Sequence, residues 1–220
     1  MLKKILLITV TLIFATIGCA STAPVKFETR KGINPDTKKV VTMSVYDTSS
    51  KTIGASDDES NKAFGSIAQA EVGNIYSSLI PGGDATIKVA DGLKIKNELD
   101  KAMGNVTEAI VNSNSVDPKT TEIFAKLATK IGVDALAFPI VSGTKEGLKQ
   151  APGLTYRFAL YDVKDASIQY VVQIDSVMVN SMLFEKADDN QKKVLISTAA
   201  TQAANALFAK IKEELAKPKK

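Results

Sequence analysis

A strict two-residue alternation runs through two neighbouring segments, 154–161 and 168–175, and it constrains the fold more than any other feature of the chain. In both segments every second residue is large and apolar, as expected for strands with one face on a core. The polar residues 164–167 between them have the composition of a short turn. The pattern therefore predicts an antiparallel β-hairpin. Residues 177–184 are expected to extend its second strand through a bulge.

Three further segments are predicted to be strands. Residues 39–47 and 133–141 carry apolar side chains on both alternating faces, which is typical of strands that are buried on both sides. A shorter strand is expected at 85–89. Pro139 lacks the backbone N–H that the interior of a strand donates, so it predicts a bulge or the end of its strand.

Helices are indicated by apolar residues at steps of three and four and by residues that begin or end helices. Asp91 and Asp117 are predicted to cap the helices that follow them, and Gly132 is a natural end for the second of these. The segment 104–118 stays open between a helical turn and a loop. The expected helices span 62–79, 92–103, 118–131 and 191–216.

The order of these elements predicts the fold class, which is α/β (α+β). We expect a single domain at 38–216, a length sufficient for a sizeable hydrophobic core. It should contain one mixed sheet of about five strands packed by about four helices, ending in a β-hairpin and a long C-terminal helix.

The start of the chain has the organisation of an export signal. Lys3 and Lys4 precede an uncharged apolar run at 5–14, which is shorter than the roughly 20 apolar residues that a membrane-spanning helix needs. Gly18 then precedes Cys19, the single cysteine of the chain. This junction resembles the lipobox of bacterial lipoproteins, in which the signal is removed and the cysteine is acylated.

The lipobox resemblance implies that residues 1–18 are a lipoprotein signal peptide and that Cys19 carries diacylglycerol and palmitate. Ala20 replaces the aspartate associated with inner-membrane retention, which implies the cell outer membrane, with the periplasmic or surface face left open. Residues 19–37 would then hold the lipidated cysteine and a flexible tether, although part of this stretch could pair with the sheet as an edge. Two alternatives remain, a secretory signal cut near Ala20 or Ala23 and an uncleaved anchor helix.

The composition of the chain limits which catalytic and binding sites it can form. The chain has no histidine and one cysteine, which excludes a Ser-His-Asp triad, a Cys-His pair, an imidazole metal site and an internal disulfide. The formal charge of +4 includes two signal lysines, and the other lysines are scattered apart from the tail, so no nucleic-acid partner is indicated. Asp47, Asp162 and Asp175 lie near strand ends, where aspartate usually forms turns, and nothing indicates that two of them meet for acid–base work. No catalytic residue, metal site or cofactor is predicted.

A long polar loop at 48–61 contains the cluster Asp57, Asp58 and Glu59. These carboxylates could bind a cation, but they lack the spacing of a calcium loop. Their position before a helix favours a simpler role, stabilisation of the positive end of the helix dipole. The same loop is the candidate surface for contact with a partner, with a merely solvated loop as the alternative.

Four stretches carry a family resemblance: KKVVTMSVYD, VADGLKIKNELDKAM, TEIFAKLATKIGVDALAFPIVSG and TYRFALYDVKDASIQYVVQID. They resemble the periplasmic α/β module shared by the TolB amino-terminal domain, the penicillin-binding-protein activator LpoB and the curli secretion protein CsgG. Two departures are Ala166, where the hairpin of these proteins usually has glycine, and a tether without the long proline-rich stretch typical of LpoB. The resemblance implies the fold and a non-enzymatic task performed by docking onto envelope proteins.

The sequence therefore predicts an outer-membrane-anchored lipoprotein that acts as a non-enzymatic protein-interaction or adaptor module in the cell envelope. Its expected partners are the membrane, through the lipid on Cys19, and an envelope protein, and homo-oligomers are compatible with this prediction. One alternative is a subunit of an oligomeric CsgG-like secretion or pore assembly, for which 168–184 would be the available membrane strand. The other is a surface-exposed adhesin.

Overall fold

The computed structural model describes residues 24–32, 34, 36–53, 58–86, 96–112, 115–143, 153–178 and 181–217. The predictions for the signal, Cys19, Asp57 and Asp91 lie outside these residues. The strands are β1 (Lys26–Thr29), β2 (Lys39–Thr42), β3 (Tyr46–Asp47), β4 (Thr52–Ile53), β5 (Asp84–Thr86), β6 (Ala135–Ser142), β7 (Gly153–Asp162) and β8 (Ser167–Met178). The helices are α2 (Glu59–Leu79), α3 (Lys96–Val111), α4 (Pro118–Ile131), α5 (Ser181–Lys186) and α6 (Asp189–Leu215).

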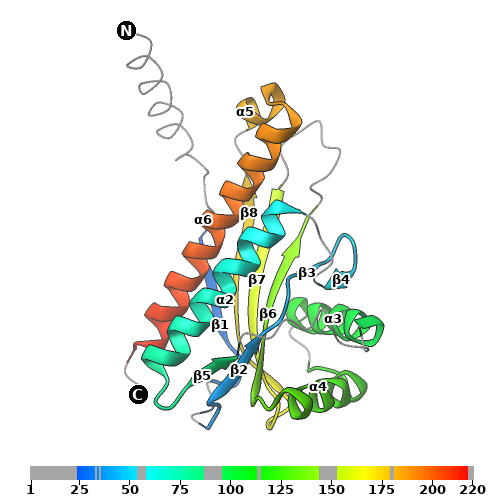
Figure 1. The fold of residues 1–220 in the computed structure, drawn as a ribbon, viewed down its shortest axis with the longest axis vertical. Helices are drawn as coiled ribbons and strands as arrows, with labels where there is room; N and C mark the ends of the chain where they lie inside the picture. Colours follow the sequence, from blue (N-terminus) through cyan, green and yellow to red (C-terminus); the bar gives the residue numbers. More distant parts are fainter. Residues whose placement is uncertain are drawn as a thin grey trace.

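One mixed sheet contains all of these strands (Figure 1). Its main order is β1-β8-β7-β6-β2-β5, while β3 continues beyond β2 along β6 and pairs with β4. The β2–β5, β2–β6 and β3–β6 pairs are parallel, and the β6–β7, β7–β8, β1–β8 and β3–β4 pairs are antiparallel. The predicted α/β class, the hairpin and the long C-terminal helix are confirmed. The sheet has more strands than predicted because β1 and β4 join it and because the strand predicted at 39–47 is divided into β2 and β3.

The edge strand β1 comes from the stretch predicted to be a tether. It pairs antiparallel with β8, and Phe27 lies opposite Val172. The Phe27 ring stacks on Tyr170 with ring centroids 5.4 Å apart, so apolar contact supports the backbone pairing. The sequence left open whether part of 19–37 pairs with the sheet as an edge. The residues of β1 do so.

Pro139 lies inside β6 without ending the strand. Thr42 and Tyr46 are separated by three residues, whereas their partners Ala137 and Ile140 are separated by two. The β2–β3 side thus carries one extra residue, which is a β-bulge. The Ala137 carbonyl accepts from Met43 N on this side, so Pro139, two residues later, also faces the bulge. The predicted bulge is confirmed, and it lies on the neighbouring strand.

Helices cover both faces of the sheet (Figure 1). On the face packed by α2 and α6, the inward residues of the hairpin include Phe158, which meets Phe208 of α6 at a centroid distance of 4.9 Å. On the face packed by α3 and α4, Tyr161 meets Phe124 of α4 at 5.2 Å. The alternating side chains of β7 therefore enter two hydrophobic cores, a first core on the α2–α6 side of the sheet and a second core on the α3–α4 side. Burial of each such side chain contributes about 1.5–3 kcal/mol.

The helix ends follow the local signals in the sequence. Asp117 accepts from the backbone N–H groups of Lys119 and Thr120 at 3.1 Å each, and Gly132 ends α4 in the left-handed region with φ 81°. These two predictions are confirmed. Asp188 begins α6 with a capping box, in which its side chain and that of Gln191 each accept from the other's backbone N–H.

Two segments differ from the prediction. α3 continues to Val111 through the segment left open between a turn and a loop, because Val106 and Ile110 are buried at helical spacing against the second core. Residues 181–186 form α5, so the expected extension of the second strand through 177–184 is wrong beyond the end of β8. α5 instead buries Phe184 in the first core.

Candidate functional site

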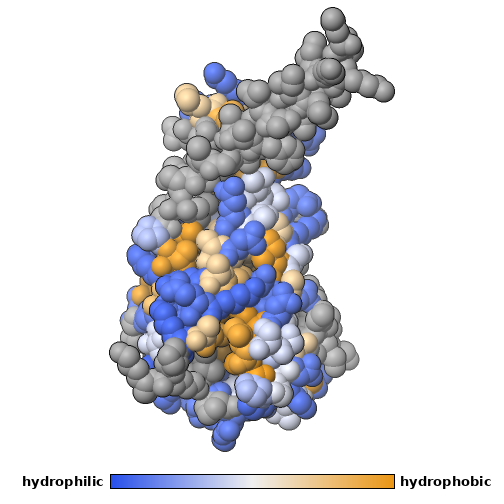
Figure 2. All heavy atoms as spheres, turned by 90° about the vertical axis from the view of Figure 1, so that its left-hand side faces the viewer, coloured by the Kyte–Doolittle hydropathy of each residue, from blue (hydrophilic) through white to orange (hydrophobic). Residues whose placement is uncertain are grey.

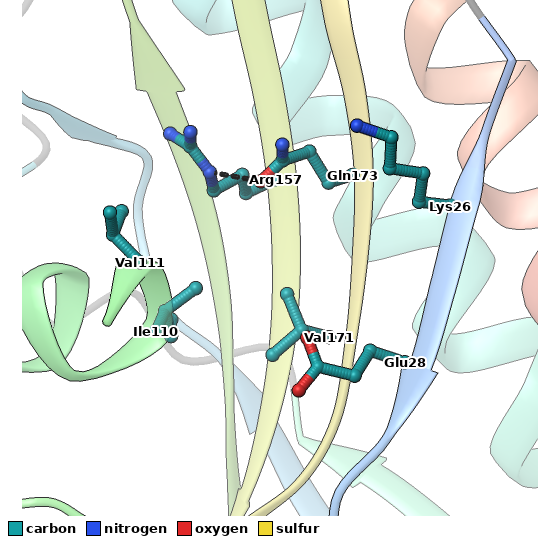
Figure 3. Close-up of a pocket in the computed structure, with 7 residues that line it drawn as sticks. All are labelled: Lys26, Glu28, Ile110, Val111, Arg157, Val171 and Gln173. Carbon is teal, nitrogen blue, oxygen red and sulfur yellow. Dashed lines mark hydrogen bonds between the residues drawn. The ribbon is translucent and has the colours of Figure 1, made fainter. Parts of the chain in front are cut away.

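The helices on the α3–α4 side leave part of the sheet uncovered. They cover the stretch of β7 and β8 that contains Ala159 and Val171, but Arg157 and Gln173, on the same face and closer to α5, are only partly buried. A hollow of about 220 Å³ lies here between the end of α3 and the edge strand β1 (Figure 3). We call it the open-face groove. Its lining residues are Lys26, Glu28, Ile110, Val111, Arg157, Val171 and Gln173.

A row of polar side chains from the four neighbouring strands β6, β7, β8 and β1 crosses the upper part of this groove. Arg157 donates from Nη1 to Ser142 Oγ at 3.0 Å and from Nε to Gln173 Oε1 at 2.5 Å. Gln173 Nε2 donates to Asp175 Oδ1 at 2.5 Å, and Lys26 Nζ lies 2.9 Å from Asp175 Oδ2. The row follows from the sheet register, which places Gln173 directly opposite Arg157 on one side and Lys26 on the other. Figure 3 shows the Arg157 and Lys26 side chains along this row.

The Arg157 guanidinium is a positive charge on a partly covered part of the sheet face. Partial burial lowers the pKa of Arg157, and nearby Asp175 opposes this shift. Arginine still stays protonated at neutral pH because its ordinary pKa is far above that range. The groove therefore holds a half-buried cation whose Nε and Nη1 atoms are oriented by side chains of adjacent strands.

Arg30, just after β1, fixes the wall that α3 forms beside the groove. Its Nη1 and Nη2 atoms donate to the carbonyl oxygens of Ala109 and Ile110 at 3.1 and 2.5 Å, and its Nε donates to Glu28 at 2.9 Å. A cation at a helix C-terminus also complements the negative end of the helix dipole. This contact holds Ile110 against the groove, while the next residue, Val111, is 58% exposed at its rim.

The predicted contact loop is described only in part. Asp58 is the N-cap of α2 and accepts from Ser60 N at 2.8 Å and Asn61 N at 3.2 Å, so the interpretation as a helix start is confirmed for this residue. Glu59 lies in the first turn and forms an exposed ion pair with Lys62 at 3.0 Å. Contact with a partner through Asp57, Asp58 and Glu59 stays a prediction.

The strand-end aspartates do not form a catalytic pair. Asp47 lies opposite Val141 and Asp162 lies opposite Ala135, six positions apart along β6, which corresponds to about 20 Å. Asp47 accepts from Ser49 and Asn61, while Asp175 belongs to the polar row of the groove. Within the described ranges, no group of three metal-ligating side chains was found and no helix has the length and apolar character to cross a bilayer.

Sequence reasoning missed the groove. The alternation in the hairpin assigned Arg157 and Gln173 to the solvent side of their strands, but it could not place Lys26 beside Gln173 or Arg30 at the end of α3. The hairpin pattern could have indicated that Arg157 and Gln173 face each other on neighbouring strands. The shift in register between Leu160 and Tyr161 hid this pairing, because it changes which residues lie opposite each other.

Comparison with known proteins finds no matching family model and no matching curated protein. Among solved structures, the chain is similar to a PelC dodecamer from Paraburkholderia phytofirmans, with 13% identity, a TM-score of 0.43, and 88% of this chain and 97% of that chain covered. It is also similar to a neuraminyllactose-binding hemagglutinin homolog from Helicobacter pylori, with 12% identity, a TM-score of 0.40, and 88% and 92% covered. The LpoB C-terminal domain from Escherichia coli matches with 16% identity, a TM-score of 0.31, and 63% and 81% covered. LpoB is one of the proteins named in the sequence resemblance. Similarities of this size transfer no activity or partner to this chain.

Proposed function

We propose that this chain is an outer-membrane lipoprotein, anchored through Cys19, that acts as a non-enzymatic protein-interaction module by means of the open-face groove. The observation that carries the proposal is the juxtaposition of a half-buried Arg157 with an exposed apolar rim at Val111. Protein interfaces favour arginine at their energetically important positions, and the fully buried core of an interface is more apolar than the rest of the surface.

The chemistry of the groove suits recognition better than catalysis. Its charged groups, Arg157, Lys26 and Glu28, are held by neighbouring side chains rather than aimed at a nucleophile. Arg157 can donate further hydrogen bonds, since a guanidinium has five N–H donors. A partner segment that brings acceptors to Arg157 and apolar side chains to Val111 and Val171 would match the surface.

The anchoring part of the proposal rests on the export signal and on the single cysteine that follows Gly18. The acyl chains of a lipoprotein bury many methylenes, each worth about 0.8 kcal/mol, so the attachment would be stable. Lys26, the first residue of β1, lies seven positions after Cys19, which keeps the domain close to the membrane.

The test places a photo-crosslinking amino acid at Val111 in cells that produce the full-length protein. The matched control carries the same amino acid at Lys130, an exposed position in the last turn of α4. We expect a discrete adduct with another envelope protein from Val111 but not from Lys130, and a weaker adduct when Arg157→Met removes the cation. Equal crosslinking from both positions, or none from Val111, contradicts the proposed contact surface.

The mass of the intact mature chain tests the anchor separately. A chain that begins at Cys19 and carries diacylglycerol and an acyl group agrees with the proposal. A chain that begins at Ser21 or Pro24 without lipid would instead support an ordinary secretory signal.

A further inference from the structure

Large apolar side chains are exposed at the end of the molecule where α5 meets the first turns of α6. Met182 is 72% exposed, Leu183 39% and Val194 60%, whereas the neighbouring Phe184 is buried. We call Met182, Leu183 and Val194 the apical patch. Figure 1 places α5 beyond the end of β8, and Figure 2 shows apolar atoms at this end of the molecule.

The direction of β1 determines which end of the domain receives the tether. β8 runs from the hairpin turn toward α5, and β1 is antiparallel to it, with Lys26 opposite Gln173 and Thr29 opposite Tyr170. The first residue of β1 is therefore its closest to α5. The chain that arrives from Cys19 must approach β1 from the end that carries the apical patch.

The length of the tether limits how far this end can stand from the membrane. Seven residues from Cys19 to Lys26 span at most roughly 25 Å when fully extended. Gln173, beside Lys26, is five residues from the end of β8 at Met178, a distance of about 17 Å. The difference of roughly 8 Å is about the thickness of one layer of lipid headgroups.

We infer that the apical patch docks on the lipid surface, with Met182, Leu183 and Val194 inserted among the headgroups. This inference rests on the acylation of Cys19 in the proposed function. The lipid holds the α5 end at headgroup distance, and the patch presents to that surface the side chains that gain most from leaving water. The α3–α4 end and the C-terminus of α6 then point away from the membrane.

The charges around the patch indicate apolar rather than electrostatic docking. Basic side chains at Lys186 and Lys193 are accompanied by acidic ones at Glu185 and Asp189, and all four residues are exposed. A mixed surface of this kind has no net attraction to anionic lipid. Binding of a second copy is disfavoured by size, because a stable dimer needs about 800 Å² from each partner and three side chains supply much less.

The experiment uses the full-length lipidated chain in phosphatidylcholine vesicles, with and without phosphatidylglycerol. Because Cys19 is acylated, a thiol introduced by Met182→Cys is the only one that can take a polarity-sensitive fluorophore. Leu79→Cys is the matched control. Leu79 is also a large apolar side chain that is exposed (38%), but it is the last residue of α2 and lies at the opposite end of the sheet. Spin-labelled lipids in the vesicles then report contact with the bilayer by quenching the fluorophore.

We expect quenching at position 182 to exceed that at position 79 several-fold, to the same extent in both lipid mixtures. Equal quenching at the two positions overturns the docking. Energy transfer between labelled copies without lipid quenching also overturns it, in favour of self-association. The intact mass of the same sample separates the two proposals: a chain without acyl groups overturns the anchor and the docking together, whereas an acylated chain unquenched at 182 overturns the docking alone.

Discussion

The buried carboxylate of Asp162 connects segments that are far apart in the sequence. It is 1% exposed and accepts from the Thr37 hydroxyl, from Gln169 Nε2 at 3.0 Å and from Asp165 N at 2.7 Å. Thr37 precedes β2, Gln169 lies in β8, and Asp165 lies in the hairpin turn. One side chain therefore joins the approach to a central strand, the second strand of the hairpin and the turn.

Replacing this carboxylate by Asp162→Ala removes the acceptor of the buried Thr37 hydroxyl and leaves the buried Gln169 Nε2 with only Thr37 Oγ1, at 3.3 Å. Leaving a buried polar group unsatisfied costs about 1–3 kcal/mol, and a hydrogen bond to a charged group contributes about 1.5–3 kcal/mol. The exposed turn amide of Asp165 can turn to water and adds little. We expect a loss of about 2–4 kcal/mol in the free energy of unfolding, which lowers the melting temperature of a domain of this size by roughly 10 °C.

The assay is urea unfolding of the detergent-solubilised chain, followed by circular dichroism of its helices. The matched control is Asp165→Ala, which removes an exposed carboxylate of the same turn that accepts from Asn34 Nδ2 at 3.3 Å. This control should change the free energy of unfolding by no more than about 0.5 kcal/mol. A loss below about 1 kcal/mol for Asp162→Ala, or equal losses for the two variants, refutes the assignment of Asp162 as a buried structural acceptor.

Three further outcomes are expected. Ala166→Gly should raise the free energy of unfolding by about 0.5–1 kcal/mol in the same urea assay, because Ala166 has φ 47°, a left-handed conformation that glycine adopts without strain; a loss of stability would refute this. Asp117→Ala should cost about 1 kcal/mol at neutral pH through loss of the α4 cap. Hydrogen bonds, the largest of them with Thr120, lower the pKa of Asp117 below its ordinary 3.8. The cap therefore stabilises the fold above pH 3.8, and its contribution is lost as the pH falls through the folded-state pKa. A difference in the free energy of unfolding between wild type and variant that grows in acid would contradict this sign. Light scattering of the detergent-extracted lipidated chain should give a molar mass near one chain, whose precursor is 23.5 kDa, whereas a ring of many subunits would favour the pore alternative.

Several elements could be predicted because their signals are local. The α4 helix is delimited by Asp117 and Gly132, whose caps involve backbone groups within four positions. The hairpin of β7 and β8 was predictable because its alternation and its turn lie within one short stretch. Where a local signal was weak, as in 104–111, burial against the second core decided that α3 continues.

The candidate site depended on contacts that no local pattern encodes. Lys26 and Asp175 are 149 positions apart, and Arg30 reaches the end of α3 across 79 and 80 positions. Only the docking of β1 on the hairpin brings Lys26 into the row that contains Arg157 and brings Arg30 to the end of α3. The sequence by itself determined the elements, their caps and the features of an export signal, because each depends on neighbouring residues. The tertiary structure decided the edge strand, the open-face groove and the end of the domain at which the tether arrives, because these depend on which distant segments pair and in which direction.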